Sequence, residues 1–495
     1  MKIKVTSLWL TAAVLLSLLA GCTGDSSPSN TGQTNRNASK VSSRNMKSTA
    51  EKNTPDDFSY KTDKNSTSSA SAKYKARQTL HSDTSLIGKT IFSSKQNENV
   101  ILVDRDSQVF LKNVTVSKIT TGASDSGKDR PCGSGSAILG ISGTICIKNS
   151  QITTAAKNSS GIFSCGNSEM GIADSTVITE KKNSDGITAA RIGTLYAKNL
   201  KVTTKGPSSS PLVNNYGTLA VKGGTYTSSE KESPGVYSNF STSIGYAAVR
   251  ASQSEAARIE GTGSVELYKT TLSGKKSTAD KTDRDWNVIM TKDISSYGDS
   301  CFYMEGGSLK AENSGMFYSE STSSRILLNN VNIKTSGKNH YFLKVINKTR
   351  EISKDSSKLN NSADCKLAAY DQKMTGDIIW DTGSRLDVRM KGSSILTGRI
   401  IRKKRKSSKQ NNYCRVSIGR NSIWIVAGNS RITVLNNLGT IKDELNKSVT
   451  VKDPHGRIFY KGNSKYSITA DSYYETGMID TDAISVFNKS FDRMK

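Results

Sequence analysis

The chain has 495 residues and a net charge of +27, with 70 Lys and Arg against 43 Asp and Glu. This charge predicts attraction to polyanions, but the sequence contains no helix-turn-helix, RNA-recognition or zinc-finger pattern, so nucleic-acid binding is not expected. A chain of this length usually forms two to four domains, unless repeats build one solenoid in which each coil contacts only its neighbours.

The first 21 residues have the pattern of an export signal. Lys2 and Lys4 precede an uncharged apolar run at 5–19. This run is shorter than the roughly 20 apolar residues that a membrane-spanning helix needs. We therefore predict a cleaved signal peptide at 1–21.

The end of the apolar run, Leu19-Ala20-Gly21-Cys22, resembles the lipobox of bacterial lipoproteins. The resemblance implies cleavage before Cys22, acylation of that cysteine with diacylglycerol and palmitate, and an extracytoplasmic protein held on the cell membrane by its lipid. Such a protein would be exposed at the cell envelope or surface. The alternative is an ordinary secretory signal with a chance cysteine.

Residues 22–90 are rich in Ser, Thr, Asn and Lys and contain few large apolar side chains. A segment of this composition buries too little surface to offset its ordering entropy, so we expect a disordered tether. A flexible coil of roughly 60 residues has an end-to-end distance on the order of 45 Å, enough to hold a domain away from a membrane.

An eleven-residue pattern then recurs along the chain: a small residue, a spacer, an apolar residue, a spacer, an apolar residue, a polar pair, two spacers and a further apolar residue. The copy at Gly143 reads GTICIKNSQIT. Copies open at Ser107, Gly143, Ser168, Gly193, Gly217, Thr242, Gly263, Ser300, Ser324 and Leu386. Most neighbouring copies are about 21 to 25 residues apart, a period typical of solenoids.

A second strip of aliphatic residues has the same period and consists of Ile138, Ile162, Ile187, Leu212 and Val236. The alternation of apolar and polar residues within each copy predicts strands, and the Gly, Asn and Asp between them predict turns. We expect Ile145 and Ile147 to face the interior and Lys148 to lie in a turn. The sequence thus predicts an all-β parallel β-helix at 91–440, with coils of roughly 24–25 residues, followed by a β-rich cap and tail at 441–495.

These repeats resemble the pectin-lyase-like right-handed parallel β-helices, and among them bacterial surface proteins described as adhesin-like. The segments that carry the resemblance are 233–237 (SPGVY), 254–267, 301–318, 374–400 and 421–433. It implies a right-handed β-helix. It also implies two alternative functions, because this family contains both binding proteins and enzymes that cleave acidic polysaccharides.

Candidate catalytic residues are few. The acids in 104–106, and Asp377 and Asp381 around Trp380, do not match a hydrolase or lyase motif, and such spacing is common in solvated turns. The three histidines form no triad or zinc-ligand pattern, and we expect them in turns or at the surface. They are His81, His340 and His455. No metal or cofactor is expected.

Six cysteines follow Cys22 and form no CxxC pair: Cys132, Cys146, Cys165, Cys301, Cys365 and Cys414. The spacing leaves two possibilities open. The cluster of Cys132, Cys146 and Cys165 could form a disulfide outside the cytoplasm, or the cysteines could be small buried thiols stacked in a β core.

The densest charge lies in RIIRKKRKSSK, between two repeat-like segments, which predicts a projecting basic loop. Its basic residues are Arg399, Arg402, Lys403, Lys404, Arg405, Lys406 and Lys409. This loop could bind acidic glycan, teichoic acid, lipopolysaccharide or phospholipid headgroups, or it could be only a solvated insertion. Tyr216, Tyr237 and Tyr318 could stack on sugars, although tyrosine in strands more often packs.

We therefore expect a lipid-anchored, non-enzymatic surface β-helix, an adhesin or a protein that binds glycan or another anionic polymer, including ligands on a host surface. The alternative is a polysaccharide lyase or glycoside hydrolase acting on acidic polysaccharide.

Overall fold

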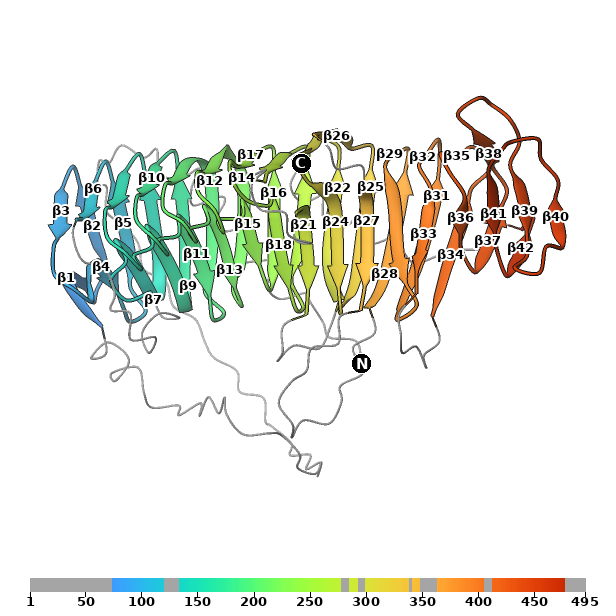
Figure 1. Cartoon of the computed structure of the whole chain (residues 1–495). Coiled ribbons are helices and arrows are strands. Elements are labelled where there is room, and N and C mark those ends of the chain that lie inside the picture. The colour runs from blue at the N-terminus through green and yellow to red at the C-terminus, as the bar shows by residue number, and fades with distance from the viewer. Residues whose placement is uncertain are drawn as a thin grey trace, which may run out of the picture. The chain divides into compact units, whose positions relative to one another are not determined.

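The computed structural model describes residues 74–119, 133–276, 285–292, 299–337, 341–347, 363–404 and 412–476. Within these ranges the chain winds into a parallel β-helix (Figure 1). Strands one coil apart in the sequence lie side by side and pair in parallel, which builds a 34-stranded sheet that wraps around the coils. The predicted all-β solenoid is confirmed.

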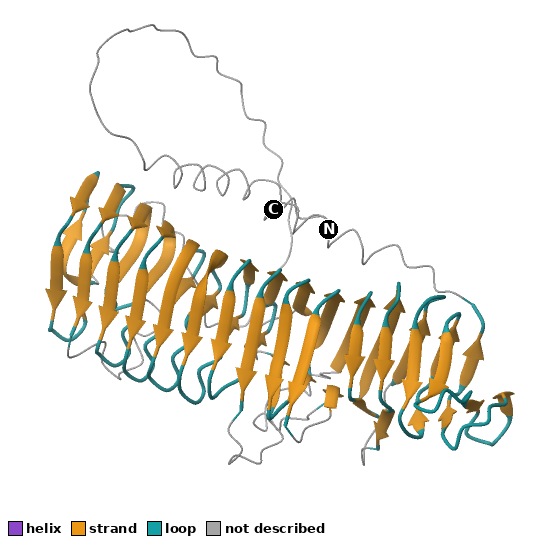
Figure 2. Ribbon diagram, turned by 90° about the horizontal axis from the view of Figure 1, so that it is seen from above, coloured by secondary structure: helices purple, strands orange, loops and turns teal. Residues whose placement is uncertain are grey.

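Each coil contributes up to three strand segments, which stack on those of the next coil to form three faces, A, B and C. Figure 2 shows the resulting row of strands. Face A consists of β1 (Lys75–Leu80), β4 (Glu98–Val103), the start of β7 (Ile138–Lys148), the start of β9 (Ile162–Ala173), β11 (Ile187–Ala190), β13 (Leu212–Asn215), β15 (Val236–Ser238), β18 (Ala257–Glu260), β21 (Trp286–Thr291), β24 (Gly315–Glu320), β27 (Tyr341–Ile346), β30 (Asp377–Asp381) and β33 (Ile400–Lys403).

Face B follows face A in each coil. It consists of β2 (Thr84–Ile87), β5 (Gln108–Lys112), the ends of β7 and β9, the starts of β12 (Thr194–Thr204) and β14 (Thr218–Ser228), β16 (Ser241–Gly245), β19 (Ser264–Tyr268), β22 (Asp299–Glu305), β25 (Ser323–Asn329), β28 (Ala363–Tyr370), β31 (Ser384–Lys391), β34 (Tyr413–Ile418), β37 (Val434–Asn437) and β42 (Ser472–Tyr474).

Face C closes each coil. It consists of β3 (Thr90–Ser93), β6 (Thr115–Lys118), β8 (Gln151–Thr154), β10 (Thr176–Thr179), the ends of β12 and β14, β17 (Ala248–Ala251), β20 (Thr271–Lys275), β23 (Ser308–Glu312) and β26 (Asn332–Ser336). In later coils this place is taken by the four-stranded sheet of β29 (Lys373–Thr375), β32 (Ile395–Thr397), β35 (Ile423–Val426) and β38 (Thr440–Asp443).

The described part of the cap also contains a small sheet of β36 (Ser430–Arg431), β39 (Thr450–Lys452), β40 (Ile458–Tyr460) and β41 (Ser467–Thr469). In this sheet β39 and β40 pair antiparallel. None of the described segments is a helix long and apolar enough to cross a membrane. The predicted signal peptide and Cys22 lie outside the described residues.

The β-helix begins earlier than the sequence predicted. The first coil, formed by β1, β2 and β3, starts at Lys75 and pairs in register with the second coil. The boundary of the expected tether at residue 90 is therefore wrong. The error arose because the first coil is polar. Among its strand residues only Leu80 and Ser93 are buried.

The second strip of aliphatic residues is confirmed as one line of face A. Ile138, Ile162, Ile187, Leu212 and Val236 pair one to the next and are all fully buried. Such a stack places each side chain on its equivalent in the next coil, about 4.8 Å away. Burial of each aliphatic side chain contributes roughly 1.5 to 3 kcal/mol.

The register of the eleven-residue copies is also confirmed from Ser107 to Gly217, but the copy assigned to Thr242 is wrong by two residues. Leu219 pairs with Thr242, so this copy opens at residue 240. Thr242 occupies an inward position that is apolar in the neighbouring coils, and it is fully buried. Its hydroxyl is satisfied by the side chains of Asn214, at 3.1 Å, and Ser238, at 2.9 Å.

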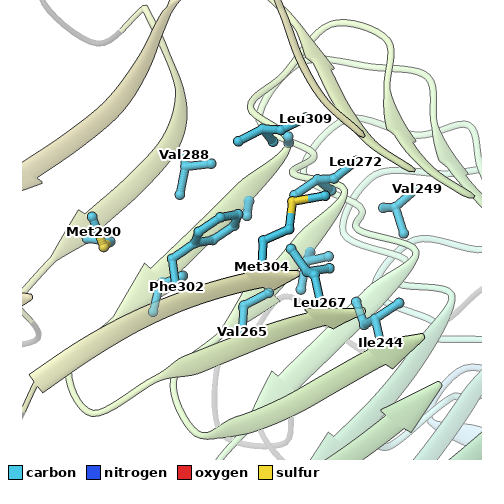
Figure 3. Close-up of a cluster of buried hydrophobic side chains, with 14 of the residues drawn as sticks. Ile244, Val249, Val265, Leu267, Leu272, Val288, Met290, Phe302, Met304 and Leu309 are labelled. Atoms are coloured by element: carbon cyan, nitrogen blue, oxygen red, sulfur yellow. The ribbon is translucent and has the colours of Figure 1, made fainter. Parts of the chain in front are cut away.

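The interior is a continuous apolar core along the described coils. Figure 3 shows one section, where Phe302 and Met304 of β22 lie close to Val265 and Leu267 of β19. Ile145 and Ile147 are fully buried as predicted. Lys148 is half-buried at the end of β7, so its assignment to a turn is wrong.

The corner between faces C and A is fixed by a ladder of buried serines. The backbone amide of Ser159 donates to the hydroxyl of Ser184, at 3.2 Å, and that of Ser184 to the hydroxyl of Ser209, at 2.8 Å. The amide of Ser209 donates to Ser233 at 3.0 Å. Because these bonds satisfy buried polar groups between coils, they hold the turns above face A in register.

Candidate functional site

The basic segment that begins at Arg399 is not simply a projecting loop. Arg399 contacts Asp377 through its side chain, with Nε 2.8 Å from Oδ2, and this contact raises the pKa of the guanidinium. Arg402 lies on β33, and its guanidinium sits over the ring of Trp380, 5.3 Å from the ring centre. The prediction of a loop is therefore wrong for residues 400–403.

Lys403 ends β33 and Lys404 follows it, and both are exposed. Arg405, Lys406 and Lys409 lie outside the described residues. Arg399 and Arg402 are thus used in contacts within the β-helix, although the side chain of Arg399 is 48% exposed. Lys403 and Lys404 are the described members best placed to bind a ligand.

The acidic candidates have structural partners. Asp104 is buried and bonds to the ring of His81, whereas Asp106 is exposed and accepts from Ser142 at 2.7 Å. Buried Asp381 accepts the amides of Asn347, at 3.1 Å, and Gly383, at 3.0 Å, and so closes a turn. These contacts agree with the turn interpretation for Asp104 and Asp106, but Asp377 and Asp381 begin and end strand β30, so the turn interpretation is wrong for that pair.

The histidines do not form a site within the described ranges. His81 is half-exposed, and His455 lies in an exposed turn. His340 lies outside the described residues. Among the residues that the structure describes, no three His, Cys, Asp or Glu side chains are grouped so that they could hold a metal ion.

Two of the cysteines match the possibility of stacked thiols. Cys365 and Cys414 are fully buried free thiols that occupy equivalent inward positions on either side of Leu386. Burial raises the pKa of both, to about 12 for Cys365. Cys301 is a half-buried free thiol, and Cys132 lies outside the described residues.

The three candidate tyrosines have different environments. Tyr318 is buried and stacks on Trp286, with ring centres 5.5 Å apart, so it packs. Tyr216 is exposed at a corner. Tyr237 is half-buried on β15 and lines a groove, which makes it the candidate best placed to contact a ligand.

This groove has a volume of about 750 Å³ and lies over the outer surface of face A, at β13, β15 and β18. Val213, Tyr237 and Arg258 occupy one register position on these strands and form its floor. The turns between faces C and A supply further lining residues, including Pro234 and Glu255. A floor with an aromatic ring beside a guanidinium, and polar walls, suits a sugar ring.

Glu255 is the electrostatic centre of the groove, and its side chain is 1% exposed. Its Oε1 accepts from Nε of Arg258 at 2.7 Å, and its Oε2 lies 2.6 Å from Nζ of Lys276. Ser254 also donates to Oε2, at 2.8 Å. Burial by itself would raise the pKa of Glu255, but Arg258 and Lys276 outweigh burial and lower the pKa to about 2.

Three further carboxylates of the groove, Asp185, Glu232 and Glu260, are hydrogen-bonded to residues that line it. Tyr237 donates its hydroxyl to Glu260 at 2.9 Å. Asp185 accepts the amide of Ser210 at 2.8 Å, and Glu232 accepts the hydroxyl of Ser208 at 3.0 Å. These bonds hold the acceptors in fixed positions before a ligand arrives.

Glu255 and Arg258 are poorly suited to proton transfer. A glycoside hydrolase needs a carboxylic acid whose pKa is raised towards neutral, but that of Glu255 is lowered and both its oxygens are occupied. A lyase that uses arginine as a base needs a neutral guanidine. Burial would lower the pKa of Arg258, but Glu255 outweighs it and raises the pKa.

Sequence reasoning found Tyr237 but missed Glu255, Arg258 and Lys276 as a cluster. In the sequence, the segment 254–267 shows only the family resemblance, and Lys276 lies at the end of another face of the same coil. The signal that could have found them is an acid in the short turn between the face C and face A strands, because a carboxylate that becomes buried there requires cationic partners nearby.

No family model, curated protein or solved structure matches this chain.

Proposed function

We propose that this chain is a lipid-anchored cell-surface β-helix that binds glycans without cleaving them. The observation that carries the proposal is the groove on face A, where Tyr237 offers a ring and fixed polar groups surround it. Aromatic rings stack on sugar faces, while hydroxyls of a sugar can exchange hydrogen bonds with carboxylates such as Glu260.

The low pKa of Glu255 and the high pKa of Arg258 support binding over catalysis. A lipid on Cys22 would retain the protein at the membrane, and a polar segment after it would let the β-helix extend into the envelope. The combination is that of a surface protein that attaches to glycans of its own envelope or of a host.

The test uses the full chain in detergent and measures retention on immobilised peptidoglycan, hyaluronan, alginate and polygalacturonate. Tyr237→Ala should weaken retention on the preferred glycan about five- to tenfold, since it removes the stacking ring. The matched control is Tyr474→Ala, which removes a half-exposed tyrosine from the cap. Equal retention of both variants and the parent would overturn the assignment of the groove.

A further inference from the structure

Four lysines form a line along the corner where face B turns into face C. Lys112 pairs in register with Lys148, and Lys198 pairs in register with Lys222. Ala173 occupies the same position in the coil between Lys148 and Lys198. The line therefore spans five consecutive strands of face B: β5, β7, β9, β12 and β14.

Within the described residues, none of these lysines has a carboxylate partner. No ion pair joins Lys112, Lys148, Lys198 or Lys222 to an acid there. Asp174 is the only acid at the five turns of this corner, which are 112–113, 148–149, 173–174, 198–199 and 222–223. Like charges on neighbouring strands about 4.8 Å apart are unfavourable, so this line favours an external anion.

Aromatic side chains continue the line. The ammonium group of Lys222 lies 6.0 Å from the ring centre of Tyr246, and the rings of Tyr246 and Tyr268 meet edge to face at 5.3 Å. Tyr268 occupies the register position that Lys222 holds two coils earlier, but it is buried, so Tyr246 is the ring of this pair that reaches the surface. From Lys112 to Tyr268 the line covers six coil steps, or about 29 Å.

On face B of these strands the lysines lie in this one line, and across the corner face C adds the exposed Lys201 of β12. The neighbouring outward position on the same strands, two residues earlier, holds only uncharged residues: Phe110, Cys146, Gly171, Tyr196 and Ala220. A membrane surface is planar and would contact cations spread over several rows. A narrow straight line of cations that ends at tyrosines instead complements a linear chain that carries anionic groups at intervals and has rings that stack.

We propose that this lysine–tyrosine line binds a linear acidic polysaccharide that lies along the helix axis. Lys112, Lys148, Lys198 and Lys222 bind its carboxylate or sulfate groups, and exposed Tyr246 contacts a sugar ring. The line lies at the corner of faces B and C, whereas the groove lies on face A, so each surface binds independently of the other. It would add a second glycan-binding surface, one that follows the helix axis.

The test replaces Lys112, Lys148, Lys198 and Lys222 together by Gln in the full chain. The matched control replaces Lys157, Lys182, Lys373 and Lys447, which are exposed and dispersed, by Gln. Both variants lose the same net charge. Affinity for polygalacturonate and for heparin is measured across salt concentrations, with neutral dextran as the uncharged probe, and melting curves confirm that both variants fold.

We expect the line variant to lose at least about tenfold in affinity, with a clearly smaller loss in the control. The slope of log affinity against log salt concentration should also fall, by roughly 0.7 to 0.9 for each lysine contact removed. Restoring the charge by Arg at the four positions should restore binding.

Equal losses in the two variants, or unchanged affinity of the line variant, would overturn the proposal. The proposal would also be overturned if the line variant lost binding to vesicles of anionic phospholipid but kept its affinity for the polysaccharides. That result would identify a membrane as the partner. Tyr237→Ala keeps the lysine–tyrosine line intact, so a failure of the groove leaves this result unaffected.

Discussion

Replacing Glu255 by Gln should strongly destabilise the coils around the groove. The carboxylate is buried between Arg258 and Lys276, and its pKa is lowered from the ordinary 4.5 to about 2. This shift corresponds to about 3 kcal/mol at neutral pH. Removing one partner of a buried ion pair typically costs about 3 to 5 kcal/mol, because the cations then lack a counter-charge.

The pH dependence follows from the direction of the shift. Because the folded pKa is lowered, the stabilisation by Glu255 is complete above about pH 4.5 and is lost as the pH falls towards 2. The parent should therefore lose more stability than Glu255→Gln between pH 5 and pH 2. The stabilities of the two proteins should therefore become more similar in acid.

Hydrogen exchange is the suitable assay, because a solenoid opens locally rather than as one unit. The amide of Gly235 donates to the carbonyl of Glu255, and that of Ala256 to the carbonyl of Asn287, so both report on this region. At pH 7 the variant should exchange these amides roughly a hundredfold faster. Glu312→Gln is the control, because its pair with Lys275 is exposed and should contribute less than about 1 kcal/mol. Equal exchange in both variants would refute the electrostatic reasoning.

Three further predictions concern the core, the anchor and the basic segment. Ile145→Ala should cost about 2 to 5 kcal/mol by chemical denaturation and Lys148→Ala should be nearly neutral; similar losses would disprove the inward register. Cys22→Ser should abolish incorporation of labelled palmitate, and a variant that still labels and stays with membranes would contradict the lipid anchor. Reversing Lys403 and Lys404 to Glu should leave the melting temperature within about 1 °C and reduce retention on heparin; unchanged retention would exclude these two lysines from binding.

The sequence was sufficient to predict the architecture because identical positions of successive coils stack on one another. The aliphatic line from Ile138 to Val236 is visible as a period in the sequence and is a physical column in the structure. The prediction failed where a coil replaces an aliphatic residue by a polar one. Thr242 breaks the pattern, yet it fits the core because Asn214 and Ser238 satisfy its hydroxyl.

The groove could not be predicted, because its residues are brought together by stacking of turns whose lengths vary. Glu255 and Lys276 are 21 residues apart, at the two ends of one coil. The step from Ala257 to its partner Val288 is longer than the regular coil, so period counting loses the register there. The prediction of a projecting loop for the basic segment failed for another reason. Arg399 and Arg402 are charged, but their side chains contact Asp377 and Trp380 of strand β30.

The most direct test of non-catalytic glycan binding is a single titration of the full chain with a size-defined oligosaccharide of the retained glycan, followed by product analysis of the same mixture by mass spectrometry. The account predicts saturable binding and recovery of the oligosaccharide at its original mass after prolonged incubation, with and without Ca²⁺. Shorter products with unsaturated or new reducing ends would contradict it and would identify the protein as a polysaccharide lyase or glycoside hydrolase.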